Sequence, residues 1–357
     1  MRTARQWRQC KLYKWHGFAH KDQEPKAGDL ALFCPACPQP GINVDPSALS
    51  PSGRSETDTD HTPSWVFTRY LVMDGNFKAE HLHPVNPSDE VSLMDGLSFM
   101  VADERYKTHL SIAKDNVERS DCNNHRAVNQ ANASRQRLEA TGIGGCACAR
   151  HGCFVPHSMV DFQKGERRVH IMSHFSSSVI PVVFDLRSVA GLTHLPFRQM
   201  NMDYALSQAL NYKTDGFSRA ITFYDINCQY NKYLQDRVAA SMYLSIPIGM
   251  DIIPAIGLWH VHGHQDSCYV RYASNFIPGT GRIDGEIMET LWAPLNIISP
   301  SARGMGTPHR KEVLDYQMND CNFMKMIRMS EWNPSFLWIL AHPRPIFNRQ
   351  PGSSAES

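Results

Sequence analysis

The sequence predicts a layered α/β fold, and three observations lead to that fold class. Apolar, strand-like segments at 66–73, 220–226 and 255–262 alternate along the chain with helical patterns. With 42% hydrophobic and 20% charged residues, most of the chain should be globular. At 357 residues it is long enough to bury a real core, in one large domain or two modest ones.

The N-terminal part, 1–64, is expected to be an arm, a knuckle and a linker. Residues 1–26 read as a basic helix with seven Lys or Arg against two acidic residues. That charge suits contact with phosphates, and a solvated terminal helix explains it equally well. The knuckle at 34–41 carries Cys34 and Cys37, which is either half a zinc site or a Pro-rich turn. A Pro- and Ser-rich linker follows to residue 64.

The predicted core begins at Trp65. Its first strand, 66–73, ends at an Asp-Gly pair, and the alternating segment 77–83 is expected to return as a hairpin partner. The later elements are a helix, a Cys/His-rich loop, a helix, two strands and two helices, expected at 125–140, 146–153, 201–212, 220–226, 255–262, from about 286, and at 310–329.

Targeting signals are not apparent. The N-terminus lacks the apolar core of a signal peptide. The most apolar stretch, 243–259, contains Pro247, Asp251 and Pro254, so no membrane span is expected. Ten cysteines and seventeen histidines without a secretion signal favour thiols and zinc ligands in a reducing compartment, the cytosol or the nucleus.

Three acidic residues occupy apolar stretches, where a lone carboxylate is costly unless it is paired or binds a cation. Asp74 ends RYLVMDGNF, Asp225 interrupts AITFYDINCQY and Glu289 lies in GRIDGEIMETLW. Carboxylates at adjacent strand ends, with a third reaching in from a helix, would hold two Mg²⁺ ions about 3.5–4 Å apart and support phosphodiester cleavage. That arrangement predicts a ribonuclease-H-like nuclease or transposase core.

Each acid also has an ordinary explanation. Asp74 suits an Asp-Gly turn, and Asp225 could be neutralised by a paired side chain. Glu286 and Glu289 are three residues apart and share one helix face with Trp292, as an exposed helix pair would. The spacing therefore leaves open which glutamate would bind metal.

Two C-x-x-H pairs predict a structural zinc site. Cys122 and His125 precede the expected helix and Cys148 and His151 follow it, so the four could close one tetrahedral site. Buried free cysteines and chance pairs would give the same pattern.

A second histidine group lies further along the chain. On the expected 255–262 strand, His260, His262 and His264 would share one face, with Cys268 just beyond. That face could be a metal-adjacent or phosphate-facing patch, or a row of hydrogen-bonded core histidines.

Eight longer stretches carry a family resemblance: CPACPQPGIN, VMDGNF, CNNHRAVNQAN, CARHGCFVPHSMVDFQKGER, MNMDYAL, YDINCQY, LWHVHGHQDSCYVRYASNF and GRIDGEIMETLW. They closely resemble KDZ (Kyakuja–Dileera–Zisupton) transposases over about residues 1–330, in particular the fungal type associated with a CxC-type cysteine cluster domain. The resemblance implies a ribonuclease-H-like DDE transposase core with a Cys/His-rich insertion. It further implies Mg²⁺ (or Mn²⁺) chemistry on DNA, both transposon ends and target DNA, in the nucleus, and is compatible with a homo-oligomer.

The resemblance also assigns residues. Asp74 and Asp225 fall on the two family aspartates, and the family's E-R-x-W motif falls on Glu289 to Trp292 with Thr290 in place of arginine. This favours Glu289 over Glu286 as the third acid. The family's Cys/His positions fall on Cys122, His125, Cys148, His151, His260, His264 and Cys268, as candidate ligands of a structural Zn²⁺.

Departures from the family pattern suggest a truncated or degenerate copy. The core would span 65–330, with 168–199 as an insertion, a candidate translated intron, and 331–357 as a truncated tail. Two functions follow as alternatives: a DDE-type transposase that cleaves and joins DNA, or a catalytically inactive, zinc-stabilised DNA- or protein-binding relic.

Overall fold

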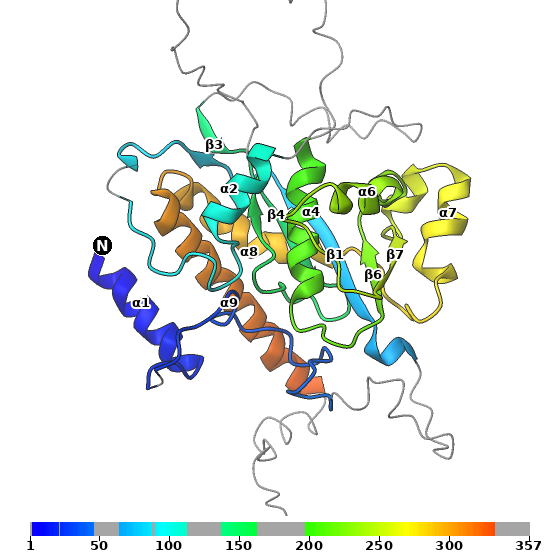
Figure 1. The fold of residues 1–357 in the computed structure, drawn as a ribbon, viewed down its shortest axis with the longest axis horizontal. Helices are drawn as coiled ribbons and strands as arrows, with labels where there is room; N and C mark the ends of the chain where they lie inside the picture. Colours follow the sequence, from blue (N-terminus) through cyan, green and yellow to red (C-terminus); the bar gives the residue numbers. More distant parts are fainter. Residues whose placement is uncertain are drawn as a thin grey trace, which may run out of the picture.

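Figure 1 presents the fold as a computed structural model, which describes residues 2–20, 22–45, 64–87, 90–112, 137–162 and 197–332. A five-stranded mixed sheet lies at its centre. In spatial order its strands are β5 (Val160–Asp161), β4 (Ile143–Cys148), β1 (Arg69–Asn76), β6 (Arg219–Phe223) and β7 (Asp251–Ala255). The first three strands pair antiparallel, whereas β1, β6 and β7 pair parallel.

Strand β1 is central and is covered on both faces. Successive side chains of a strand point to opposite faces. Leu71 and Met73 therefore join one apolar core, and Tyr70 and Val72 join another. Burial on both faces explains why this strand reads as a continuous apolar run rather than an alternating one.

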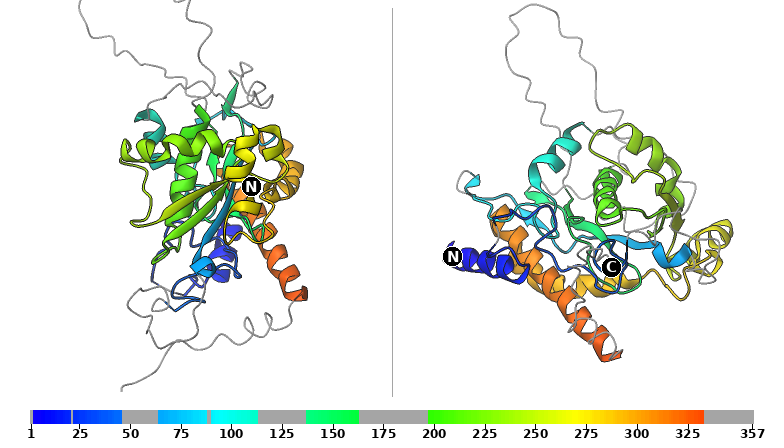
Figure 2. Two further views of the ribbon diagram at one scale, coloured as in Figure 1. Left: turned by 90° about the vertical axis from the view of Figure 1, so that its right-hand side faces the viewer. Right: turned by 60° about the horizontal axis from the view of Figure 1, so that its bottom comes forward.

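Three long helices form the outer layers. They are α4 (Phe197–Asn211), α8 (Ile287–Ala302) and α9 (Thr307–Trp332). Met202 and Leu206 of α4 pack in the core that contains Leu71, while Leu291 of α8 and Leu314 of α9 pack in the opposite core. Figure 2 shows green α4 and orange α9 on opposite sides of the sheet.

The shorter elements surround this framework. They are α1 (Arg2–Trp15), α2 (Asp103–Ile112), α5 (Asn227–Tyr230), α6 (Leu234–Ala239), α7 (Asp266–Tyr272), the 3₁₀ turns η3 (Ser64–Phe67), η6 (Asn231–Tyr233), η7 (His260–Gly263) and η8 (Ser274–Phe276), and a two-stranded sheet of β2 (His81–Leu82) and β3 (Leu138–Ala140). The basic helix α1 is tied to α9, because Arg5 Nε lies 2.7 Å from Glu312 Oε2.

Polar side chains of α9 bind the backbone of irregular segments. The Asp315 carboxylate accepts the N–H groups of Phe99 and Met100, at 3.0 and 2.8 Å. Asn319 Oδ1 accepts the N–H of Leu32 at 2.8 Å. Buried backbone groups without a sheet partner need such acceptors, so α9 organises the non-strand segments around it.

The mixed α/β class is confirmed, but the expected hairpin after Asp74 is wrong. β1 runs through Asp74 to Asn76 and pairs with β4, while β2 pairs with β3. Gly75 does not turn the chain. A side chain there would come within 2.5 Å of the Phe162 ring, so the glycine serves close packing inside a strand.

Two further expectations are corrected. Residues 138–140, expected at the end of a helix, form strand β3, and residues 125–136 of that segment lie outside the described residues. The strand expected over 255–262 ends at Ala255, and His260 begins the turn η7. At Gly257 a side chain would meet the Glu286 carboxylate at 2.2 Å, so the backbone passes close to Glu286 just beyond the strand. The histidines therefore do not share a strand face.

Within the described ranges, no helix has both the length and the apolar character needed to cross a bilayer.

Candidate functional site

Asp74 and Asp225 lie near two neighbouring parallel strands. Asp74 is in β1, and Asp225 is in the turn that follows β6. The two strands pair through Val72 and Phe223, each two residues before one of the aspartates. The charge of Asp74 acts on Asp225, so the two carboxyl groups are near neighbours. Their joint role in metal binding stays a prediction.

Glu289 approaches from the first turn of α8. Gly285, with φ +80°, passes so close to Phe223 that a side chain would come within 2.5 Å of its ring, which brings the helix start to the end of β6. Glu289 is exposed. One turn later the Trp292 indole N–H donates to Asp74 Oδ2 at 2.7 Å, which fixes α8 against the first aspartate.

His260 lies between two carboxylates. Its Nε2 is 3.2 Å from Asp225 Oδ2 and its Nδ1 is 2.7 Å from Glu286 Oε2. The other oxygen of Glu286 accepts the backbone N–H of Trp259 at 3.0 Å. Glu286 thus holds the turn that carries His260. Both glutamates act electrostatically on Asp225, and Glu289 also acts on Asp74.

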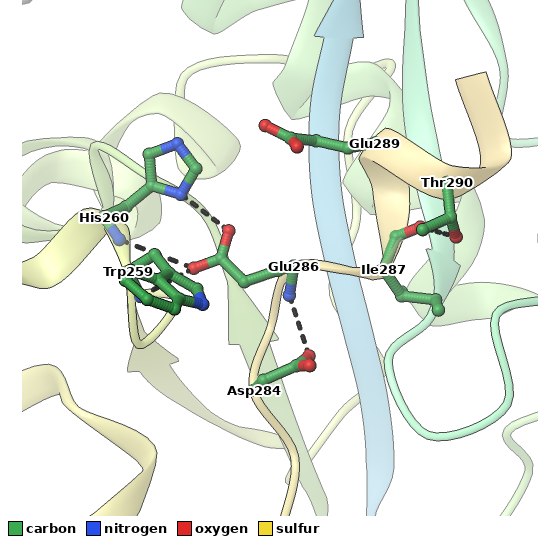
Figure 3. Close-up of a pocket in the computed structure, with 7 residues that line it drawn as sticks. All are labelled: Trp259, His260, Asp284, Glu286, Ile287, Glu289 and Thr290. Atoms are coloured by element: carbon green, nitrogen blue, oxygen red, sulfur yellow. Dashed lines mark hydrogen bonds and ion pairs between the residues drawn. The ribbon is translucent and has the colours of Figure 1, made fainter. Parts of the chain in front are cut away.

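A hollow of about 530 Å³ opens beside this group and is lined by Trp259, His260, Asp284, Glu286, Ile287, Glu289 and Thr290 (Figure 3). In Figure 3 the Glu289 carboxylate extends toward the side of the His260 ring, and Glu286 bonds that ring directly. Trp259 is 81% exposed at the rim. A ligand in this hollow can therefore reach the carboxylates of Glu286 and Glu289 from solvent.

The carboxylates are crowded enough to alter their protonation. Burial raises the pKa of Asp225 to about 7, and the charges of Asp74, Glu286 and Glu289 add to that rise while His260 opposes it. Burial likewise raises the pKa of Asp74, against the hydrogen bond from Trp292. One imidazole faces several acids, so the cluster favours a further cation.

A separate Cys/His cluster lies at the C-terminal end of β4, which is Cys148. It consists of Cys34, Cys37, Cys148 and His151, whose ligand atoms all lie within 4.8 Å of one another. His151 Nδ1 is 3.3, 3.6 and 3.4 Å from the sulfurs of Cys34, Cys37 and Cys148, and the sulfurs of Cys37 and Cys148 are 3.1 Å apart. Three sulfurs and one nitrogen at these separations could hold a tetrahedral zinc ion.

The thiols of this cluster also alter one another's protonation. Hydrogen bonding to Cys148 raises the pKa of Cys34 and of Cys37, and burial adds to both. The pKa of Cys148 falls because it accepts from both neighbours. Zinc binds thiolates, so it would remove this competition for protons.

A third group gathers Cys228, His264 and Cys268 within 4.8 Å. Across the ranges covered by the structure, these two Cys/His groups are the ones that reach that separation, and the acidic residues are spread more widely.

The predicted ligands are therefore redistributed. Cys148 and His151 cluster with Cys34 and Cys37 in a group that could hold a metal ion, whereas Cys122 and His125 lie outside the described residues. His264 and Cys268 meet each other. His260 does not join them and instead contacts Asp225.

Sequence reasoning missed two links. Cys34 stands 117 residues from His151, and no spacing rule connects pairs so far apart. Cys228 was not proposed as a ligand. The signal that the sequence offered was its position three residues after Asp225, in the motif YDINCQY.

Comparison with known families gives one match. The description "Kyakuja-Dileera-Zisupton transposase" fits residues 67–192 and 196–322. Those segments contain both aspartates, Glu289 and the whole Cys228 group, whereas Cys34 and Cys37 precede them. Neither curated proteins nor solved structures gave a match. With most of its length matched, the chain belongs to the Kyakuja-Dileera-Zisupton (KDZ) transposase family.

Proposed function

We propose that this protein is a DDE-type transposase with a ribonuclease-H-like core, which cleaves and joins DNA with bound Mg²⁺ or Mn²⁺. One observation carries the proposal: Asp74 of β1 and Asp225, two residues beyond the paired end of β6, interact electrostatically with each other and with Glu289 in the first turn of α8. Membership in a transposase family supports the same chemistry.

The donor set suits divalent magnesium. Asp74, Asp225 and Glu289 offer carboxylate oxygens, the ligands that Mg²⁺ prefers. When bound, the ions would activate an oxygen nucleophile and stabilise the departing 3′-oxygen of the DNA.

The neighbouring residues orient these ligands. Trp292 holds one oxygen of Asp74 by its indole N–H, which fixes the orientation of that carboxylate. Glu286 holds the His260 ring, and His260 directs Nε2 to Asp225. Burial lowers the pKa of His260, but Asp225 and Glu286 raise this pKa by more than burial lowers it. The net shift is upward and favours the imidazolium. His260 thus supplies part of the positive charge that the acids require.

The decisive test is Asp225→Asn. Loss of one ligand charge should abolish Mg²⁺-dependent nicking of DNA that carries the element's ends, with the circular dichroism spectrum unchanged. The matched control is Asp251→Asn, an exposed aspartate on β7, which should cleave like wild type. Undiminished nicking by Asp225→Asn would exclude the assignment.

DNA is the partner that this chemistry requires, as transposon ends and as target, and the protein would meet both in the nucleus. A homo-oligomer would favour the joining of two transposon ends to one target DNA.

A second candidate is a non-catalytic, zinc-stabilised module that binds DNA or protein. The His260–Asp225 ion pair favours it, because that pair already neutralises one acid. Calorimetric titration of wild type and Asp74→Ala with Mn²⁺ separates the two. If the protein is a transposase, wild type should bind Mn²⁺ and Asp74→Ala should not. If it is a non-catalytic module, neither protein should give a Mn²⁺ binding signal.

A further inference from the structure

The segment after β7 forms a small lobe with little apolar core. In Figure 1 its main helix, α7, lies at the margin of the molecule beyond β7. Its core contains three buried hydrophobic residues, Ile256, Val261 and Ala273, with four partly buried neighbours. Its elements are short, at four, seven and three residues for η7, α7 and η8. Helices this short are marginal without tertiary support, so the lobe needs another source of stability.

The Cys228 group lies in this lobe and joins three separate segments. Cys228 comes from α5, His264 from the residue after η7, and Cys268 from α7. Cys228 Sγ is 3.4 Å from His264 Nδ1. Bond lengths of about 2.0–2.3 Å in a tetrahedral zinc site place neighbouring ligand atoms roughly 3.5 Å apart. The observed separation therefore matches ligands of one ion.

We propose that Cys228, His264 and Cys268 bind a zinc ion, and that this ion holds the His260 turn against the Asp225 loop. Two sulfurs and one imidazole nitrogen form a donor set that favours zinc over magnesium. Within the described part of the chain no fourth protein ligand joins the group, so the fourth position takes a water molecule or another small donor.

The positioning role follows from chain connectivity. Cys228 is three residues after Asp225, and His264 is four residues after His260. An ion between Cys228 and His264 therefore cross-links the two segments whose side chains meet at 3.2 Å in the acidic cluster. This role rests on the proposed function, whereas zinc binding by the group does not.

Zinc binding is tested by metal content. Cys228→Ser and Cys268→Ser should each carry about one zinc ion per chain fewer than wild type, because removal of a thiolate opens a three-ligand site. Cys34→Ser should lose a different ion, and Cys321→Ser, on α9 and outside both groups, should lose none. Zinc content equal to wild type in both Cys228→Ser and Cys268→Ser would overturn the proposal.

A second measurement covers the case in which the variants fail to fold. In wild-type protein, iodoacetamide should alkylate Cys228 far more slowly with zinc bound than after chelation, as judged by mass spectrometry. Cys228 is only half-buried, so its protection must come from the metal. Equal labelling with and without zinc would contradict the site.

The positioning role has its own readout. Cys268→Ser should weaken Mn²⁺ binding at the acidic cluster about tenfold, Cys268→His should restore it as a replacement ligand, and Cys34→Ser should leave it unchanged. Unchanged Mn²⁺ affinity in Cys268→Ser would remove the positioning role. If wild type binds no Mn²⁺, the proposed function fails while the zinc result stands.

Discussion

At the scale of single residues, the informative signal was an acid in an apolar stretch, and the structure separates two reasons for it. Asp315 on α9 is buried and accepts two backbone N–H groups, so its role is to organise neighbouring chain segments. Asp74 and Asp225 instead interact electrostatically with each other and with Glu289. The sequence predicted the second kind from its motifs. It could not predict the bond from Trp292 to Asp74, because that contact depends on how α8 packs.

Trp292→Phe tests that contact. Phenylalanine keeps the ring packing against Phe154, at 5.8 Å between centroids, but removes the N–H donor. We expect a loss of about 1.5–3 kcal/mol in unfolding free energy, the usual range for a hydrogen bond to a charged group, and weaker Mn²⁺ binding. Chemical denaturation and calorimetry measure the two effects. Trp15→Phe, on exposed α1, is the control, and a Trp292→Phe protein that matches it would refute the role.

Asp315→Asn tests the cost of the other buried acid. Burial raises the pKa of Asp315 from 3.8 to about 7, so the folded state holds a proton that the unfolded state releases in that interval. Wild-type stability should therefore fall as pH rises from about 4 to 7. Asparagine keeps the acceptor oxygen without the charge, so the variant should gain stability relative to wild type at pH 8, by at most roughly 4 kcal/mol. The gain should vanish near pH 4, and a constant difference across that range would contradict this reading.

At the scale of elements, long patterns were predicted well and short ones were not. The helices expected at 201–212 and 310–329 appear as α4 and α9 with shifted ends. The strand expected over 255–262 ends at Ala255, and the chain turns at His260. The close approach of Gly257 to the Glu286 carboxylate is a tertiary contact with no periodic signal. Likewise, the role of α9 as a donor and acceptor for irregular segments is invisible in its amphipathic pattern.

Asn322→Ala tests that role of α9. The Asn322 amide donates to Leu32 O and Phe154 O and accepts the Phe154 N–H, at 2.7, 2.9 and 2.8 Å. Its loss would leave buried backbone groups unpaired, at a cost of about 2–4 kcal/mol. The exposed Asp320→Ala on the same helix should change stability little. Denaturant midpoints of the two variants decide the matter, and equal midpoints would argue against it.

At the scale of the whole molecule, the Cys34 cluster joins the N-terminal segment to the core. The family match begins at residue 67, and two of the four ligands precede it. Sequence reasoning found both halves of this site but did not join them, because only the fold brings residues over a hundred positions apart together. The pairing with Cys122 and His125 stays a prediction, since both lie outside the described residues. The expected insertion at 168–199 stays a prediction, since most of it lies outside the described residues.

Cys37→Ser tests this connection. Without the zinc ion the 22–45 segment should become open to trypsin, while α7 stays protected by its own site. The midpoint temperature of thermal unfolding should fall by about 5–10 °C, as expected when a domain of this size loses a few kcal/mol of unfolding free energy. Cys321→Ser serves as the reference, because its thiol belongs to neither group. Unchanged cleavage of 22–45 would mean that hydrogen bonds from α9 hold the segment alone.

The most direct measurement is anomalous diffraction from crystals soaked in Mn²⁺. If the acids form a metal centre, manganese peaks should appear among the carboxylates of Asp74, Asp225 and Glu289, with the Asp225 side chain released from His260. Occupied crystals with no peak at those carboxylates, or with manganese only on unrelated surface acids, would contradict the account.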